Sequence, residues 1–249
     1  MDARFEFLTR MGDSCLVLSQ RVSAWCGHAP AIEEDIAMAN MALDLLGQAQ
    51  MWLSLAGAHE GKGRSADDLA YLRDVWDFRN LLLCERPNGD YGQTLMRQFL
   101  FDAWHHLMLD QLSRSSDREI AEIAAKGSRE VAYHIERSRD LVIRLGDGTP
   151  ESKARMQAAL DALWPYVGEM FADDGVDMTL AGQGAAPLPS SLRESWEAIV
   201  GAVLREGSLK RPGDDFAQLG GKAGRHSEHL GYILAEMQFL QRSYPGATW

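Results

Sequence analysis

Apolar residues recur three and four positions apart along most of the chain, which is the spacing of one face of an α-helix. One such seam runs unbroken through residues 5–26 and comprises Leu8, Met11, Cys15, Leu18, Val22 and Trp25. A second long helix is expected from about Ala31 to His59, because the acidic residues 33–35 suit the positive end of a helix dipole. No stretch alternates convincingly with a period of two, so β-sheet is not expected.

Breaks rich in glycine, proline and small polar residues separate the later helices. These are expected after the cap at Ser65, at about 91–112, at 120–145, at 150–171 with a bend at Pro165, at 190–205 and at 225–242. Residues 172–189 are expected to form a long loop with little regular structure. The two long helix pairs within about 5–145 predict an all-α fold built on an up-down four-helix bundle. Residues 146–249 would add peripheral and C-terminal helices, so the prediction is a single domain over 1–249.

The composition limits the classes of molecule that the chain is expected to bind. The chain has 249 residues, 46% of them apolar, and a formal net charge of −11. Such an acidic protein has no electrostatic attraction for nucleic acid or for an anionic membrane surface. Three cysteines without a Cys-x-x-Cys pair fit reduced thiols. With neither a signal peptide nor an uncharged apolar run of eighteen residues in view, a cytoplasmic location is expected.

Four-helix bundles can hold two iron ions, and the ligands needed for this can be sought in the sequence. Such a site uses two lone carboxylates and two carboxylate-x-x-His pairs, because residues three apart share a helix face. The second helix offers Asp44, but Gly47 stands where histidine would be needed. The third offers Asp102, and the fourth offers Glu130 followed by Tyr133. We therefore interpret these five residues as degenerate ligand positions and predict no metal, catalytic or cofactor-binding residue in this chain.

Other interpretations of these carboxylates stay open. Asp13 on the first helix lies off the apolar seam. Asp102 and His105 do have carboxylate-x-x-His spacing, and they predict either a buried Asp–His hydrogen bond or a partly exposed pair. The carboxylates could also be solvated charges, or a polar cluster in the core that includes His134. An unusual active metal site would use Asp44, Asp102, His105, Glu130 and His134.

Two further patterns point to no strong chemistry. His226 and His229 lie one helical turn apart, but no matching ligand pair accompanies them, so a surface or interface role is expected rather than zinc. The segment 220–224 does not match a phosphate-binding loop, because alanine follows its lysine and no strand precedes it. The chain has no Gly-x-Ser-x-Gly elbow.

Four segments carry a resemblance to a known family. They are Trp25–Pro30, Glu33–Ala49, Arg144–Thr149 and, near the end of the chain, Leu230–Gly246. Together they resemble the C subunits of phenylacetyl-CoA epoxidases, also called phenylacetate-CoA oxygenases. The resemblance extends over essentially the whole chain.

This resemblance implies a ferritin-like fold and a structural role. In the family, a related catalytic A subunit holds the di-iron centre and epoxidises the aromatic ring of phenylacetyl-CoA with O2 in aerobic phenylacetate degradation. A reductase supplies electrons from NADPH, and a small B subunit links the pairs of A and C. The C subunit would stabilise A without iron of its own, and alone it could form a homodimer. Two alternatives remain: an active di-metal oxidoreductase, and a self-associating helical protein without an oxygenase partner.

Overall fold

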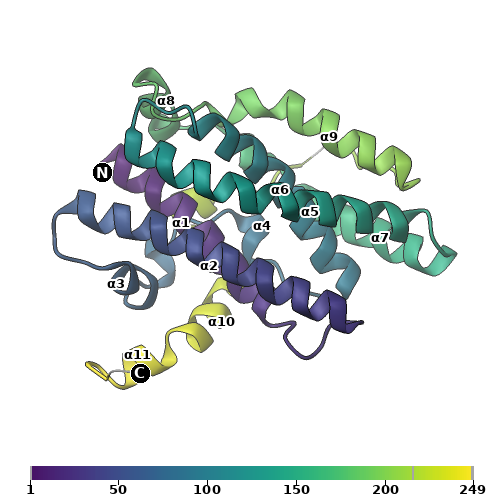
Figure 1. Ribbon diagram of the computed structural model, residues 1–249, viewed down its shortest axis with the longest axis horizontal. Helices are drawn as coiled ribbons and strands as arrows, with labels where there is room; N and C mark the ends of the chain where they lie inside the picture. Colours follow the sequence, from purple (N-terminus) through teal and green to yellow (C-terminus); the bar gives the residue numbers. More distant parts are fainter. Residues whose placement is uncertain (1, 215, 248–249) are drawn as a thin grey trace. The chain divides into compact units, whose positions relative to one another are not determined.

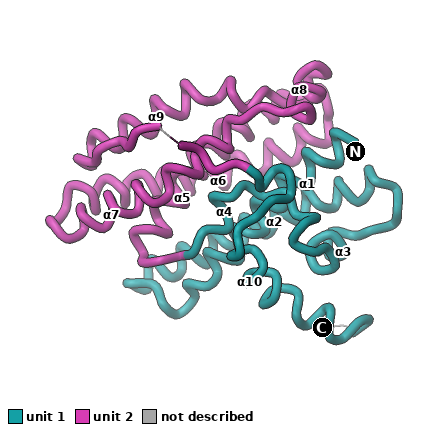
Figure 2. The backbone as a smooth tube through the Cα atoms, turned by 180° about the vertical axis from the view of Figure 1, so that it is seen from behind, with its two compact units in different colours: residues 1–87, 220–249 teal, residues 88–219 magenta. Residues whose placement is uncertain are grey.

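The computed structural model describes residues 2–214 and 216–247, and its regular structure consists of the helices α1 to α11 with short 3-10 turns between some of them. No residue in these two ranges is assigned to a strand. The prediction of an all-α fold is therefore confirmed. The residues cluster into two compact units, one of residues 1–87 with 220–249 and one of residues 88–219 (Figure 2).

The first unit is organised around a helical hairpin. Helix α1 covers Ala3–Ser23 and helix α2 covers Ile32–Glu60, and the two pack against each other along their length (Figure 1). Asp2 caps α1 by accepting a hydrogen bond from the backbone N–H of Phe5. Gly61, in the left-handed conformation, ends α2. Of the predicted seam of α1, all members except Trp25 are buried.

Short helices complete the first unit. Helix α3 covers Ala66–Tyr71 and begins with the predicted capping box, in which Ser65 and Asp68 cap each other's backbone. The turn η1 (Val75–Asp77) and helix α4 (Leu82–Glu85) follow it. The C-terminal part adds η5 (Gly221–Ala223), α10 (Glu228–Met237) and α11 (Phe239–Ser243). The sequence predicted one helix over 225–242. The structure has two helices in this region, and the first of them begins at Glu228, three residues later than predicted.

The second unit contains the other long hairpin. Helix α5 covers Tyr91–Leu112 and α6 covers Arg118–Gly146, and α7 (Pro150–Leu163) packs against α5. Thr149 caps α7 and Pro150 occupies its first turn, so the helix begins at the residue predicted from the sequence. Beyond α7, the short turns η2 (Trp164–Tyr166) and η3 (Gly168–Phe171) replace α-helix from Trp164, next to the expected bend at Pro165.

One expected loop contains a helix. Helix α8 covers Gly175–Gly182, inside the segment predicted to have little regular structure. Asp174 explains this difference, because its carboxylate accepts hydrogen bonds from the N–H groups of Val176 and Asp177 and starts the helix. The turn η4 (Pro189–Leu192) and helix α9 (Arg193–Glu206) complete the unit.

The two long hairpins are consistent with a ferritin-like bundle. A single domain with its core in residues 5–145 stays a prediction, since α1–α2 and α5–α6 belong to different compact units. None of the helices in the described ranges is both long enough and apolar enough to span a bilayer.

Candidate functional site

Asp102 lies at the centre of a buried polar cluster on α5 and α6. Its side chain is fully buried. Gln98, one turn earlier on α5, donates to Asp102 Oδ1 at 2.7 Å, and Ser138 on α6 donates to Oδ2 at 3.1 Å. Burial raises the pKa of Asp102 to about 6, although the nearby His134 and these two donors act in the opposite direction. The cluster therefore holds a carboxyl group that can change its charge near neutral pH.

Two histidines share this interior. His105, one turn after Asp102 on α5, and His134 on α6 are both fully buried. Burial lowers the pKa of His105 to about 3, and His134 and His106 lower it further. His105 is therefore a neutral imidazole over the whole physiological range. Because Asp102 and His105 are both buried, the partly exposed pair that the sequence allowed is wrong.

The other predicted ligand positions have different surroundings. On α2, Asp44 and Gly47 are half-buried. On α6, Glu130 is half-buried, whereas Tyr133 is 56% exposed. The interior position next to Tyr133 is taken by His134. Among the described residues, no three histidine, cysteine or acidic side chains are grouped so that they could hold a metal ion.

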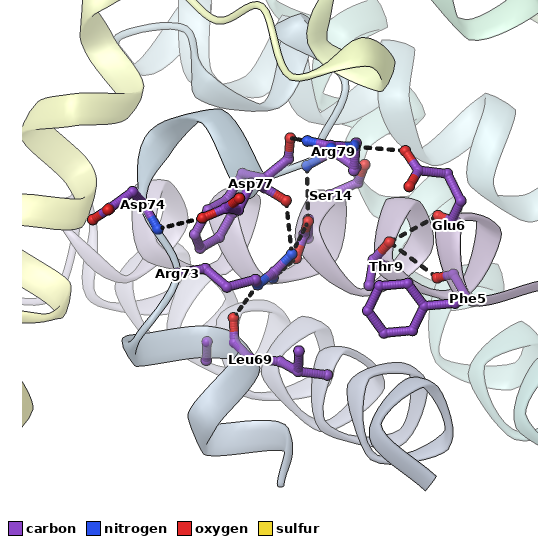
Figure 3. Close-up of polar contacts among 12 residues, drawn as sticks. Phe5, Glu6, Thr9, Ser14, Leu69, Arg73, Asp74, Asp77 and Arg79 are labelled. Carbon is purple, nitrogen blue, oxygen red and sulfur yellow. Dashed lines mark hydrogen bonds and ion pairs between the residues drawn. The ribbon is translucent and has the colours of Figure 1, made fainter. Parts of the chain in front are cut away.

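A second buried polar network lies in the first unit (Figure 3). The guanidinium of Arg73 pairs with Asp13 of α1, and its Nη1 lies 3.0 Å from Asp13 Oδ2. The backbone N–H of Arg79 also donates to Asp13 Oδ2 at 2.8 Å, while its side chain pairs with Glu6 at 2.6 Å. The guanidinium carbon of Arg73 also lies 4.4 Å from the centre of the Phe78 ring.

This network gives Asp13 surroundings that the sequence did not predict. Although Asp13 lies off the apolar seam, its side chain is fully buried. Sequence reasoning missed its partners because Arg73 and Arg79 follow sixty and more positions later, with no local pattern that links them to α1. A buried carboxylate needs such partners, since an unpaired charge in the interior is costly.

A cavity of about 530 Å³ borders the network. Its lining includes the cationic side chains of Lys62, Arg64 and Arg79. Each is paired with an acid of the same unit: Lys62 and Arg64 with Glu60, and Arg79 with Glu6. Arg73 and the carboxylates of Asp2 and Asp77 also line the cavity, so four acids face four cations and no excess positive charge is left for an anionic ligand.

Helix α2 presents apolar side chains to solvent. Ile32 is 71% exposed, Ile36 is 57% exposed, Leu43 is 65% exposed and Leu46 is 40% exposed. Their spacing of four, seven and three residues places them on one side of the helix. We call these four residues the α2 stripe. Several exposed apolar side chains along one side of a helix are typical of an interaction surface.

Together these features define a class of protein: an all-helical protein that holds buried carboxylate and imidazole side chains on two of its long helices, α5 and α6. The chain belongs to the family described as phenylacetic acid catabolic protein, which matches residues 1–249. It is 47% identical over 243 residues to the C subunit of 1,2-phenylacetyl-CoA epoxidase from Escherichia coli strain K12, and the alignment covers 98% of each chain. The family resemblance deduced from the sequence is confirmed.

Proposed function

We propose that this chain is the C subunit of a 1,2-phenylacetyl-CoA epoxidase in phenylacetate catabolism, and that it supports a catalytic subunit without performing the reaction. The observation that carries this proposal is the 47% identity to the Escherichia coli protein along 98% of both chains. The partners would be a catalytic A subunit with a di-iron centre, a small B subunit and a reductase. The complex would work in the cytoplasm.

The side chains at the predicted ligand positions favour a non-catalytic role. A di-iron site in a helical bundle needs two carboxylate-x-x-His pairs facing one interior. Gly47 has no side chain that could bind a metal, and Tyr133 is 56% exposed. Tyrosine and glycine cannot replace two neutral imidazoles as ligands of ferrous iron.

The surface of α2 favours a role through contact. Gly47 lies within this helix, where glycine costs about 1 kcal/mol relative to alanine. A Cβ atom added there would meet no other atom within 4 Å, so packing within this chain does not explain the glycine. Gly47 follows Leu46 of the α2 stripe, and a residue without a side chain lets another backbone come close. We infer that a helix of the catalytic subunit packs here.

A second candidate function is an active di-metal oxidoreductase. The observation in its favour is that Asp102, His105 and His134 are all buried in the second unit. Anaerobic loading of the purified chain with ferrous iron tests this candidate. The non-catalytic proposal predicts well under one iron per chain, whereas a di-metal enzyme would bind about two.

Reconstitution of the reaction tests the proposed function itself. Oxidation of NADPH that depends on phenylacetyl-CoA would be measured with the catalytic subunit, the small subunit and the reductase, with and without this chain. Omission of this chain should lower the rate at least about tenfold, which is about 1.4 kcal/mol of lost support for the transition state. An unchanged rate, or turnover by this chain and the reductase alone, would contradict the proposal.

A further inference from the structure

His226 connects the C-terminal segment to the rest of the first unit through both of its ring nitrogens. It lies between η5 and α10, and its side chain is fully buried. Nδ1 lies 2.9 Å from Glu85 Oε2, and Nε2 lies 2.9 Å from the backbone oxygen of Phe78. A backbone carbonyl can only accept a hydrogen bond, and so can an ionised carboxylate.

The charge of Glu85 decides the charge of His226. The Glu85 side chain is fully buried, and its Oε1 accepts hydrogen bonds from the N–H and the hydroxyl of Ser227, both at 2.7 Å. Asn80 donates to its other oxygen at 3.1 Å. Burial raises the pKa of Glu85, but the hydrogen bonds from His226 and Ser227 outweigh burial and leave this pKa below its usual value. Glu85 is therefore an acceptor at neutral pH.

With two acceptors at its ring, a neutral imidazole would have one N–H for two contacts. Its second nitrogen would then turn a lone pair toward an oxygen 2.9 Å away. Only the imidazolium form donates from both nitrogens. We infer that His226 is a cation at neutral pH and that its charge fastens residues 220–234 to Phe78 and Glu85, so that a rise in pH loosens this part of the C-terminal segment.

The charged groups around the ring are consistent with this inference. Arg21 of α1 donates to the backbone oxygen of Glu85 at 2.7 Å. Arg79, which follows η1 in the chain, donates to the same Phe78 oxygen as His226 at 2.8 Å. Burial lowers the pKa of Arg21, Glu85 raises it, Arg86 lowers it further and Glu236 of α10 raises it. Three residues further along the chain, His229 lies 3.8 Å from the exposed Glu228. The two arginines oppose a further positive charge, whereas the buried Glu85 carboxylate, in direct contact with the ring, favours it.

A separate contact limits how much of the segment depends on His226. The side-chain amide of Gln238 donates to the backbone oxygens of Ala70 and Arg73, both at 2.9 Å. Neither partner titrates, so this contact does not depend on pH. The loosening should therefore affect residues 220–234 and leave the region around Gln238 in place.

The contacts of His226 and Glu85 should hold the C-terminal segment over a limited pH range. The folded-state pKa of Glu85 is lowered, so its contribution to stability is present above its ordinary value of 4.5 and is lost as the pH falls through the folded-state pKa. The two contacts of the inferred His226 cation weaken on the other side of this range, as the pH rises. The segment should be held most firmly between these limits.

Nuclear magnetic resonance of the full chain with ¹⁵N-labelled histidine tests the inference directly. At pH 7 we expect both ring nitrogens of His226 to carry a proton, with the signal assigned by its loss in His226→Gln. The chain unfolded in urea supplies the reference, because its imidazoles titrate near the ordinary value of about 6.5. A neutral tautomer of His226 at pH 7 in the folded chain would overturn the inference.

Hydrogen exchange tests the consequence. After correction for intrinsic rates, residues 220–234 of the wild-type chain should exchange at least about tenfold faster at pH 9 than at pH 6.5, an opening-equilibrium change of about 1.4 kcal/mol. His226→Gln should exchange faster at both pH values, because glutamine can donate to only one of the two acceptors at a time. The matched control is His229→Gln on α10, which should behave like the wild type. Equal exchange in both variants, or wild-type exchange independent of pH, would overturn the inference.

Discussion

Asp13 and Arg73 form a buried ion pair that joins helix α1 to the segment after α3. The Asp13 side chain is fully buried and that of Arg73 is 6% exposed. Arg73 also donates to the backbone oxygen of Asp77, and Arg79 donates its N–H to Asp13. One carboxylate thus fixes the course of residues 73–79, which have little helical structure of their own.

We predict that Asp13→Asn destabilises the chain strongly. The substitution leaves the Arg73 guanidinium buried without its counter-charge, and loss of one partner of a buried pair costs about 3–5 kcal/mol. Urea unfolding followed by circular dichroism measures this loss.

The control for this prediction is an exposed pair. Arg118 and Glu122 on α6 are 89% and 63% exposed, so Glu122→Gln should leave the free energy of unfolding close to that of the wild type. If both substitutions changed the free energy of unfolding equally, the prediction that the buried Asp13–Arg73 pair stabilises the fold more than an exposed pair would be wrong.

Asp102 should make stability depend on pH in a direction opposite to that of an ordinary surface acid. Its pKa is about 6 in the folded chain against 3.8 for the free side chain, so the folded state binds the proton more tightly. The contribution of Asp102 to the free energy of unfolding is therefore fully present below pH 3.8 and is lost as the pH rises through about 6. The difference corresponds to about 3 kcal/mol.

Asp102→Asn isolates this contribution. Between pH 4 and pH 7 the wild type should lose stability relative to the variant, because the variant has no carboxylate to ionise in the interior. The difference between the two unfolding free energies removes the effects of other groups, such as the neutral His105. A difference that stays constant over this range would contradict the environment assigned to Asp102.

The α2 stripe should matter for assembly and not for folding. Leu43 is 65% exposed, so Leu43→Glu should change the stability of the isolated chain by less than about 0.5 kcal/mol. The same substitution should weaken binding to the catalytic subunit at least about tenfold, because it places a charge in an apolar contact. Isothermal titration calorimetry measures this affinity.

Met178 on α8 provides the matched control, since its side chain is apolar and 61% exposed. Met178→Glu should leave the affinity for the catalytic subunit unchanged. If both variants bind like the wild type, the partner uses another face of the chain.

Local signals explain which parts of the fold could be predicted from the sequence. Helix α5 begins and ends at the predicted residues because Asp90 caps its first turn, and α7 begins at Pro150 because Thr149 caps it. Helix α8 was missed because its glycine-rich composition outweighed the cap at Asp174. Such signals act over three or four residues and require no knowledge of the remaining chain.

The sites were harder to predict because they join distant positions. The bond from Gln98 to Asp102 spans one helical turn and follows from spacing, but the bond from Ser138 spans 36 positions. In the same way, Glu85 meets His226 from 141 positions away. The spacing rule pointed to Tyr133, whereas the buried residue is its neighbour His134, because one position along a helix turns a side chain by about 100°.

The mass of the assembly formed with the catalytic subunit tests the central claim most directly. Light scattering during gel filtration would be applied to this chain, of 27.7 kDa, mixed at micromolar concentration with the catalytic subunit of a phenylacetyl-CoA epoxidase. The account predicts one stable species whose mass is the sum of both kinds of chain. Separate elution, with this chain at the same mass alone and in the mixture, would contradict it.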